Sequence, residues 1–378
     1  MLTEKQKEIW ALMKQGMSGR AIGRKLNRDE ATIRHHIKKI RKEMTTDPTN
    51  PLYTVDKMSS LVRHEPNEDG KVLTWYKSSK EVEALNEIVE YVEDRIHKKY
   101  PPVPKTPKPK KALKKDLLNV FYLGDPHMNM LSWARETGKD WDLDIALAHH
   151  DLAIGDLLVR APDAEEGVLC TLGDLFHNDS LKAITPGSGN IVDVDGRLLK
   201  SWDATVIMVE RILIGMLQRY KKVHYICVPG NHSETLERLF AATLRIAFKN
   251  EKRLVVHDNV AKHIPFSWGK NFILATHGDR MNNQKKADVA VGKYRERHGN
   301  ANFTHVVCGH VHHTEQKELS GALVESFSVL PPPDAWHVES GYVTSRQAAH
   351  QVTYHSAGGI FCRSETNPRI YLQENNND

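Results

Sequence analysis

The sequence predicts a layered α/β fold that follows a small all-α module at the N-terminus. After Asp116, apolar runs typical of buried strands alternate with stretches of helical periodicity, and this alternation is typical of layered α/β cores. Before it, residues 101–115 are rich in proline and lysine, which favours an extended spacer. Residues 1–45 show only short helical patterns. We therefore predict four segments: a helix-turn-helix module at 1–45, a wing-like hairpin and helix at 46–100, a linker at 101–115 and an α/β domain at 116–370.

The charge is unevenly distributed along the chain. Residues 1–115 hold 26 Lys and Arg against 16 Asp and Glu, a net of +10, whereas residues 116–378 hold 27 against 32, a net of −5. A basic first third on an acidic body suggests an arm that attaches to a polyanion, and a merely solvated basic surface is the alternative.

Cysteine usage and hydropathy indicate the compartment. Three of the four cysteines lie inside predicted buried strands, which suits a reducing cytosol. No apolar run approaches the roughly 20 residues of a membrane span. We expect a cytoplasmic protein with no membrane contact.

Three helices are predicted in the N-terminal module. Thr3 and Asp29 can cap the first and third, and Ile33, Ile37 and Ile40 form one apolar stripe on the third. A short turn between two helices, with polar side chains on the second, is the helix-turn-helix arrangement. The residues that we expect to contact DNA are Thr32, Arg34, His35, Lys38 and Lys39.

The stretch from Leu2 to Ile40 resembles the DNA-binding modules of LuxR-type regulators and sigma factors. A small helical adaptor remains the alternative. Beyond it, residues 60–63 and 71–76 could pair as a hairpin. A helix from Ser79 to Ile96 carries a short coiled-coil seam, which would allow a homodimer or packing on a neighbouring element.

Five predicted strands of the α/β domain end in Asp, Asn or His. The motifs at these strand ends are Gly124-Asp125-Pro126-His127, Gly173-Asp174-Leu175-Phe176-His177, Gly230-Asn231-His232, Thr276-His277-Gly278 and Gly309-His310-Val311-His312. Residues i and i+2 of an extended chain point the same way, so His310 and His312 could reach one site. Two carboxylates, several imidazoles and one amide suit divalent metals of intermediate hardness. We expect two divalent ions, manganese first, with zinc, iron or magnesium as alternatives.

In this order the five motifs resemble the signature of the calcineurin-like metallophosphoesterases. The resemblance covers roughly residues 117–315 and implies two mixed sheets packed face to face with helices outside. It places Asp125, His127, Asp174 and His312 on a first metal, and Asp174, Asn231, His277 and His310 on a second, so that Asp174 bridges them. It also implies that a hydroxide between the ions is the nucleophile, and that His232 protonates the leaving oxygen or stabilises the transition state.

Two positions depart from the family pattern. The second motif usually ends in Asp, whereas His177 stands here, as in the SbcD-type DNA-repair nucleases, where a histidine helps to position the strand. Ser233 replaces the acid that many members use to orient the histidine, and Glu234 could compensate. The chain after His312 is too short for the capping and ATPase-docking segments of SbcD-type enzymes, so we do not expect an ATPase partner.

The leading hypothesis is a metal-dependent phosphodiesterase, a nuclease, that acts on DNA and carries its own N-terminal DNA-binding module. This fusion resembles phage coding, which would place the protein in the host cytoplasm. One alternative is a phosphomonoesterase on nucleotides or phosphoproteins; another is a DNA-binding regulator with a vestigial metal site. Outside the motifs we expect a loop over the site at 184–190, and His337 and Arg346 are weaker candidates for strand contacts. The histidines that lack a motif, and that we leave out of the site, are His149, His150, His263, His305 and His313.

Overall fold

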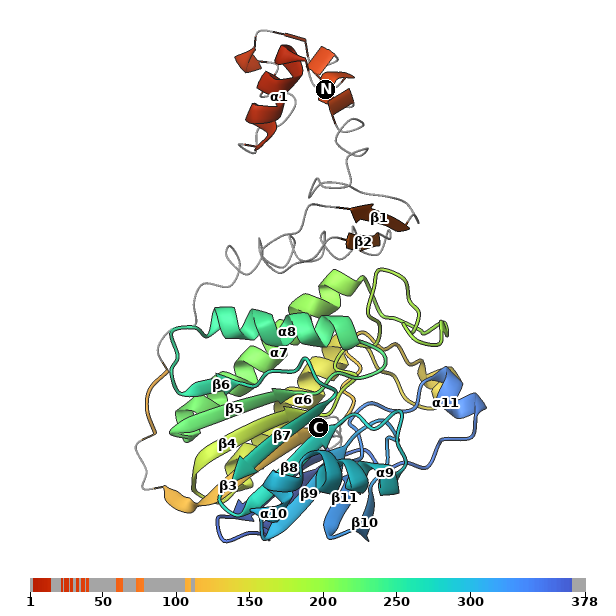
Figure 1. Cartoon of the computed structure of the whole chain (residues 1–378). Coiled ribbons are helices and arrows are strands. Elements are labelled where there is room, and N and C mark those ends of the chain that lie inside the picture. The colour runs from red at the N-terminus through yellow and green to blue at the C-terminus, as the bar shows by residue number, and fades with distance from the viewer. Residues whose placement is uncertain are drawn as a thin grey trace. The chain divides into compact units, whose positions relative to one another are not determined.

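A computed structural model of the chain describes residues 3–14, 22, 24–26, 28–29, 32–33, 35–37, 39–40, 59–63, 73–77, 106–109 and 113–368 (Figure 1). The chain divides into two compact units, Met1–Lys98 and Lys99–Asp378. The division falls next to the predicted linker at 101–115. The exact domain boundaries, including 116–370, stay predictions.

The larger unit contains a six-stranded mixed sheet with the order β13-β12-β3-β4-β5-β6. Its four neighbouring strands β3 to β6 run parallel to one another. On the other side of β3, β12 runs antiparallel to β3 and β13 runs antiparallel to β12. The strands are β3 (Lys114–Leu123), β4 (Ala164–Thr171), β5 (Lys222–Cys227), β6 (Leu254–Val256), β12 (Ala349–His355) and β13 (Ile360–Thr366). The parallel arrangement brings the carboxyl ends of β3, β4 and β5 to one edge.

A five-stranded mixed sheet has the order β10-β11-β9-β8-β7. Within it the neighbouring strands β8, β9 and β11 run parallel. At the two edges, β7 runs antiparallel to β8 and β10 runs antiparallel to β11. The strands are β7 (His263–Trp268), β8 (Asn271–Thr276), β9 (Phe303–Cys308), β10 (Glu315–Leu319) and β11 (Ala322–Ser326). Here too the ends of two neighbouring parallel strands, β8 and β9, carry motifs.

The two sheets pack face to face around one apolar core. Val168 on β4 and Ile226 on β5 belong to the same buried cluster as Ile273 on β8 and Val307 on β9. A second cluster, which includes Leu274 of β8, covers the outer face of the five-stranded sheet. The predicted architecture of two mixed sheets with flanking helices is confirmed.

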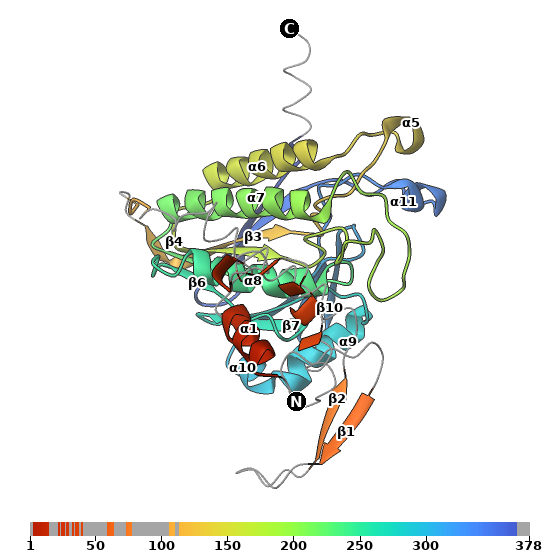
Figure 2. The same ribbon diagram turned by 90° about the horizontal axis from the view of Figure 1, so that it is seen from above.

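Helices flank both sheets, as Figures 1 and 2 show. Against the six-stranded sheet lie α6 (Leu143–Arg160), α7 (Leu198–Arg219) and α8 (Glu234–Ala247), close to the predicted ranges 142–160, 201–220 and 234–249. The remaining helices in the described part of this unit are α5 (Ala134–Thr137), α9 (Asn283–Asp288), the π-helical turn η1 (Val289–Lys293), α10 (Arg295–Gly299) and α11 (Ala335–Glu339). None of the helices in the described part of the chain combines the length and the apolar run that a membrane crossing needs.

In the smaller unit, α1 (Glu4–Lys14) begins with a reciprocal cap. The Gln6 side chain accepts from the Thr3 N–H at 2.8 Å, and the Thr3 hydroxyl accepts from the Gln6 N–H at 3.4 Å. Asp29 accepts from the Thr32 N–H at 2.8 Å, as its predicted cap role requires. The apolar residues that gather here are Ile9, Leu12, Ile22, Ile33 and Ile40, with Leu26 and Ile37 beside them.

The predicted hairpin is present: β1 (Ser59–Arg63) pairs antiparallel with β2 (Leu73–Lys77). Its role as a wing stays a prediction. The helix expected from Ser79 to Ile96, and with it the dimerisation seam, lies outside the described residues.

Candidate metal centre

The candidate ligands lie where strands of both sheets end. Asp125 and His127 follow β3, Asp174 follows β4, Asn231 follows β5, His277 follows β8, and His310 and His312 follow β9. Because the carboxyl ends of neighbouring parallel strands meet at one edge, residues far apart in the sequence converge there. All five motifs therefore contribute to one region of the molecule.

The backbone at these ends is unusual. Seven described residues other than glycine have positive φ, and five of the seven are candidate ligands: Asp125 (35°), His127 (44°), Asp174 (50°), His310 (71°) and His312 (55°). Left-handed backbone costs residues with a side chain of the order of 1 kcal/mol or more. Such strain persists only where the surroundings determine it, and it gathers at functional sites.

Two motif glycines provide the room that the carboxylates need. A Cβ at Gly230 would collide with the carboxylate of Asp174, and a Cβ at Gly309 would collide with that of Asp125. Each glycine sits in a different motif from the carboxylate it accommodates. The motifs thus depend on one another for their geometry.

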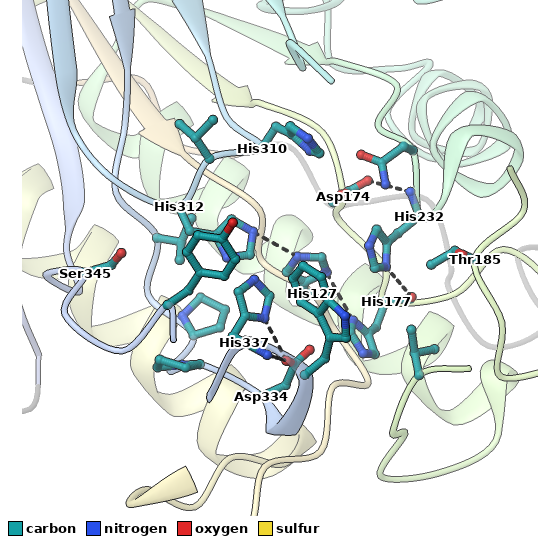
Figure 3. Close-up of a pocket in the computed structure, with 18 of the residues that line it drawn as sticks. His127, Asp174, His177, Thr185, His232, His310, His312, Asp334, His337 and Ser345 are labelled. Atoms are coloured by element: carbon teal, nitrogen blue, oxygen red, sulfur yellow. Dashed lines mark hydrogen bonds and ion pairs between the residues drawn. The ribbon is translucent and has the colours of Figure 1, made fainter. Parts of the chain in front are cut away.

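The first group of ligand atoms comes from Asp125, His127 and His312. The two histidine Nε2 atoms lie 3.3 Å apart (Figure 3), and His312 Nε2 lies 3.1 Å from Asp125 Oδ2. Donor atoms at these separations can share one ion with bonds of about 2.0–2.2 Å. The group therefore fits a divalent cation, as predicted for the first metal, except that Asp174 is outside it.

The second group comes from Asp174, His277 and His310. His277 Nε2 lies 3.1 Å from Asp174 Oδ2 and 2.8 Å from Asn231 Oδ1. The other ring nitrogen of His277 contacts the Leu172 carbonyl at 2.9 Å, which fixes the ring so that Nε2 faces the group. All four predicted ligands of the second metal are thus brought together.

The carboxylates of the two groups attract positive charge. Burial lowers the pKa of His277, but the nearby carboxylates of Asp174 and Asp125 outweigh it and raise that pKa to about 10. Burial, and then the neighbouring His232 and His177 rings, lower the pKa of His127 well below its usual value. Buried carboxylates that attract positive charge, next to neutral imidazoles, form a donor set that suits divalent metals.

The second and third motifs are held together by α8. Both carboxylate oxygens of Glu237 accept backbone N–H groups, from Leu175 at 2.7 Å and from Gly230 at 2.6 Å. Burial, and then the charge of Asp174, raise the pKa of Glu237 well above its usual value. We did not single out Glu237 from the sequence, although a carboxylate on the apolar face of a predicted helix was a usable signal.

Two further contacts join the same segments. The Ser233 hydroxyl accepts from the Phe176 N–H at 3.1 Å. The Asp179 carboxylate accepts from the N–H groups of Thr235 at 3.0 Å and Leu236 at 2.8 Å, so it caps α8 from a separate loop. We call the side chains of Asp179, Ser233 and Glu237 the clasp.

The expectation that Glu234 orients His232 is wrong. Glu234 pairs instead with Arg238 at 2.8 Å and with Lys262 at 2.6 Å. His232 is held instead by His177 and Asp174: its Nδ1 contacts the His177 carbonyl at 3.0 Å, and its backbone N–H donates to Asp174 Oδ1 at 2.7 Å. A carbonyl accepts from Nδ1–H, which leaves Nε2 as the nitrogen that can serve a substrate.

His177 is 1% exposed and packs against the first group. Its Nδ1 lies 3.1 Å from His127 Nδ1, the ring nitrogen opposite the one that faces His312. Burial, and then His232, lower the pKa of His177 to about 3. A histidine in this position can orient the His127 ring.

Residues at the strand ends form one wall of a cavity of about 470 Å³: His127, Asp174, His177, Asn231, His232, His310 and His312. The opposite wall comes from the loop predicted to cover the site, through Thr185 and Asn190, and from the loop between β11 and β12. His337 and Arg346 line the cavity from the latter, and His313, which we had left out, lines it as well. The cavity residues that we did not foresee include Asp334, Trp336 and Tyr342.

Of the predicted DNA contacts, three can be located. His35 and Lys39 are exposed and Thr32 is half-buried. Arg34 and Lys38 lie outside the described residues. The role of these side chains stays a prediction.

No protein-family model matches this chain, and no curated protein does either. Among solved structures, the chain is similar to an archaeal phosphodiesterase (13% identity, 66% of this chain and 99% of that one, TM-score 0.33). It is also similar to Yfce, a phosphoesterase from E. coli (12%, 65% and 98%, TM-score 0.30), and to a predicted phosphoesterase from Streptococcus pneumoniae TIGR4 (10%, 68% and 99%, TM-score 0.26). Scores of this size do not establish a shared fold, so the architecture above rests on the strands of this chain.

Proposed function

We propose that this protein is a metal-dependent phosphodiesterase that cleaves DNA at a site for two divalent ions. The observation that carries the proposal is the meeting of two groups of Asp and His ligand atoms at the ends of strands from both sheets. Both groups lie beside a cavity of about 470 Å³, a volume within the range of small-molecule sites. Asp174 belongs to the second group, and we propose that it also reaches the first ion.

When bound, a pair of divalent ions would polarise phosphoryl oxygens and supply a hydroxide at neutral pH. Asp125, His127 and His312 would hold one ion, and Asp174, Asn231, His277 and His310 the other. Manganese is our first choice, with zinc, iron or magnesium as alternatives. The residues of the chain then have to hold the phosphodiester and supply a proton to the leaving oxygen.

His232 is our candidate for the residue that protonates the leaving oxygen or stabilises its charge. Its ring packs against those of His127 and His177, at centroid distances of 4.8 and 5.4 Å, and it lines the cavity. With Nδ1–H donating to a carbonyl, the imidazolium form of the ring carries its second proton on Nε2, from which it can pass to the departing oxygen or stabilise that oxygen's charge. We propose His177 as a positioning residue that orients both His127 and His232.

The basic first third of the chain supports DNA as the substrate. Its net charge is +10, and exposed His35 and Lys39 belong to the helix that Asp29 caps. Neutralisation of phosphates by such a segment gives affinity for long DNA that falls steeply with salt. The proposed arm would bring the metal centre to its polymer.

An assay with three substrates tests the proposal. Purified protein would be stripped with a chelator, reloaded with Mn²⁺ and given linear duplex, single-stranded DNA and the monoester nitrophenyl phosphate. We expect cleavage of DNA that returns only with the metal. Hydrolysis of the monoester alone would favour the phosphomonoesterase, and inactivity on all three with DNA binding intact would favour a regulator.

The arm can be tested separately from catalysis by deletion of residues 1–110. We expect the truncated protein to hydrolyse methyl nitrophenyl phosphate at a similar rate and to bind long duplex more weakly at moderate salt. Equal binding of duplex by the two proteins would mean that the arm serves another purpose.

A further inference from the structure

Two exposed aromatic side chains form a paired surface at the mouth of the cavity. Trp336 in α11 and Tyr342 just after it are 58% and 60% exposed. Their rings stack at a centroid distance of 6.0 Å and an interplanar angle of 26°, and both line the cavity. We call this pair the aromatic step.

A row of rings connects the aromatic step with the metal centre. His337 stacks on the candidate ligand His312 at 4.9 Å and 20°, and Trp336 meets the edge of His337 at 5.1 Å. The rings of Trp336 and of a proposed metal ligand are thus separated by one histidine. A group held against the step would be close to a phosphate held at the metals.

The loop that carries the step is well anchored. The Asp334 carboxylate accepts from the His337 N–H at 2.9 Å and pairs with His337 Nδ1 at 2.7 Å (Figure 3). The Tyr342 N–H donates to the His337 carbonyl at 2.8 Å. At the ends of the loop, Gln347 donates to the Leu330 carbonyl at 3.1 Å. The backbone that carries the two rings is therefore fixed before any substrate arrives.

The chemistry of the step indicates what it binds. Arg346, the cationic residue closest to it in sequence, is engaged by both carboxylate oxygens of Glu365, at 2.5 and 2.7 Å. The step therefore offers flat apolar faces rather than a charge for a phosphate. Aromatic faces beside a phosphodiester-cleaving centre are suited to bases, because every base has a π-face and stacking tolerates any sequence.

We propose that Trp336 and Tyr342 stack on an unpaired nucleobase of the strand whose phosphodiester lies at the metal centre. This inference rests on the proposed function and narrows its substrate. A base within a duplex already stacks on its neighbours and pairs across the helix, so it has to leave both before it can meet a protein ring. The substrate is then single-stranded DNA or a frayed end.

The test compares two single-stranded oligonucleotides of equal length, one normal and one in which every nucleoside is an abasic tetrahydrofuran. Both carry the same phosphates, so the ratio of their kcat/KM values measures the contribution of the bases alone. We expect the wild-type enzyme with Mn²⁺ to favour the normal strand by about tenfold, a value within the range for one stacked base. In Trp336→Ala the ratio should fall to about one, and Trp336→Phe should restore most of it.

Trp133→Ala is the matched control, since Trp133 is also exposed, at 54%, but does not line the cavity. Its ratio should equal that of the wild type. An equal rate of the wild type on the two strands, or an unchanged ratio in Trp336→Ala, would overturn the inference alone. If the wild type hydrolyses methyl nitrophenyl phosphate but neither strand, the DNA assignment itself fails.

Discussion

The two walls of the cavity differ in burial, backbone and origin. On the wall of strand ends, His127, Asp174 and His177 are at most 2% exposed. On the loop wall, Trp336 and Tyr342 are more than half exposed. The first wall is determined by strand pairing and by the clasp, whereas the second depends on two loops that cross the surface. The difference suggests that the strand ends provide the chemistry and the loops choose the substrate.

The largest effect should come from Asp174, the residue that we propose as a ligand of both ions. Asp174→Asn removes a charge that we propose both ions share, so we expect hydrolysis to be abolished and bound metal to fall. Metal content and activity would be measured on the same preparation. Full activity with two ions still bound per chain would end the assignment.

His232→Ala tests the strand-end wall without removing a ligand. We expect a loss of about 10²–10⁴-fold in kcat on both DNA and methyl nitrophenyl phosphate, as is typical when a general acid is removed. Metal content should not change. A loss restricted to DNA would instead make His232 a strand contact.

His177→Ala separates two roles for a buried residue. Because His177 contacts the ring of His127, we expect metal affinity and hydrolysis of both substrates to fall about 10–100-fold, the usual effect of losing a partner of a metal ligand. The role suggested by the sequence, positioning of the strand, would lower DNA cleavage and spare the small ester. Metal titration followed by both assays distinguishes these outcomes.

The smallest effect should come from the clasp. Asp179→Ala removes the cap of α8 from the N–H groups of Thr235 and Leu236, and we expect the free energy of unfolding to fall by about 1 kcal/mol. Asp179→Asn keeps an acceptor and should lose less. Urea denaturation of the three proteins makes the comparison, and equal stability would show that the cap contributes nothing.

The wall of strand ends was largely predictable and the loop wall was not. His277 and His310 could be placed together because apolar runs that end in a polar motif predict parallel strands, and parallel strands share an edge. No comparable periodicity governs the return of the chain from β11 to β12, so Trp336 could not be placed near His312. Glu234 was misjudged because sequence proximity to His232 said nothing about Arg238 and Lys262, which engage it.

The left-handed backbone at five candidate ligands has a consequence for how this chain could change over time. At roughly 1–3 kcal/mol each, five such positions together approach the 5–15 kcal/mol by which whole domains are stable. Glycine would adopt the same conformations with far less strain. Selection for the durability of the metal-free fold alone would thus favour discarding Asp125, His127, Asp174, His310 and His312. In a lineage that no longer used the site, substitution of these residues would raise the stability of the fold, so we expect the ligands to be lost quickly.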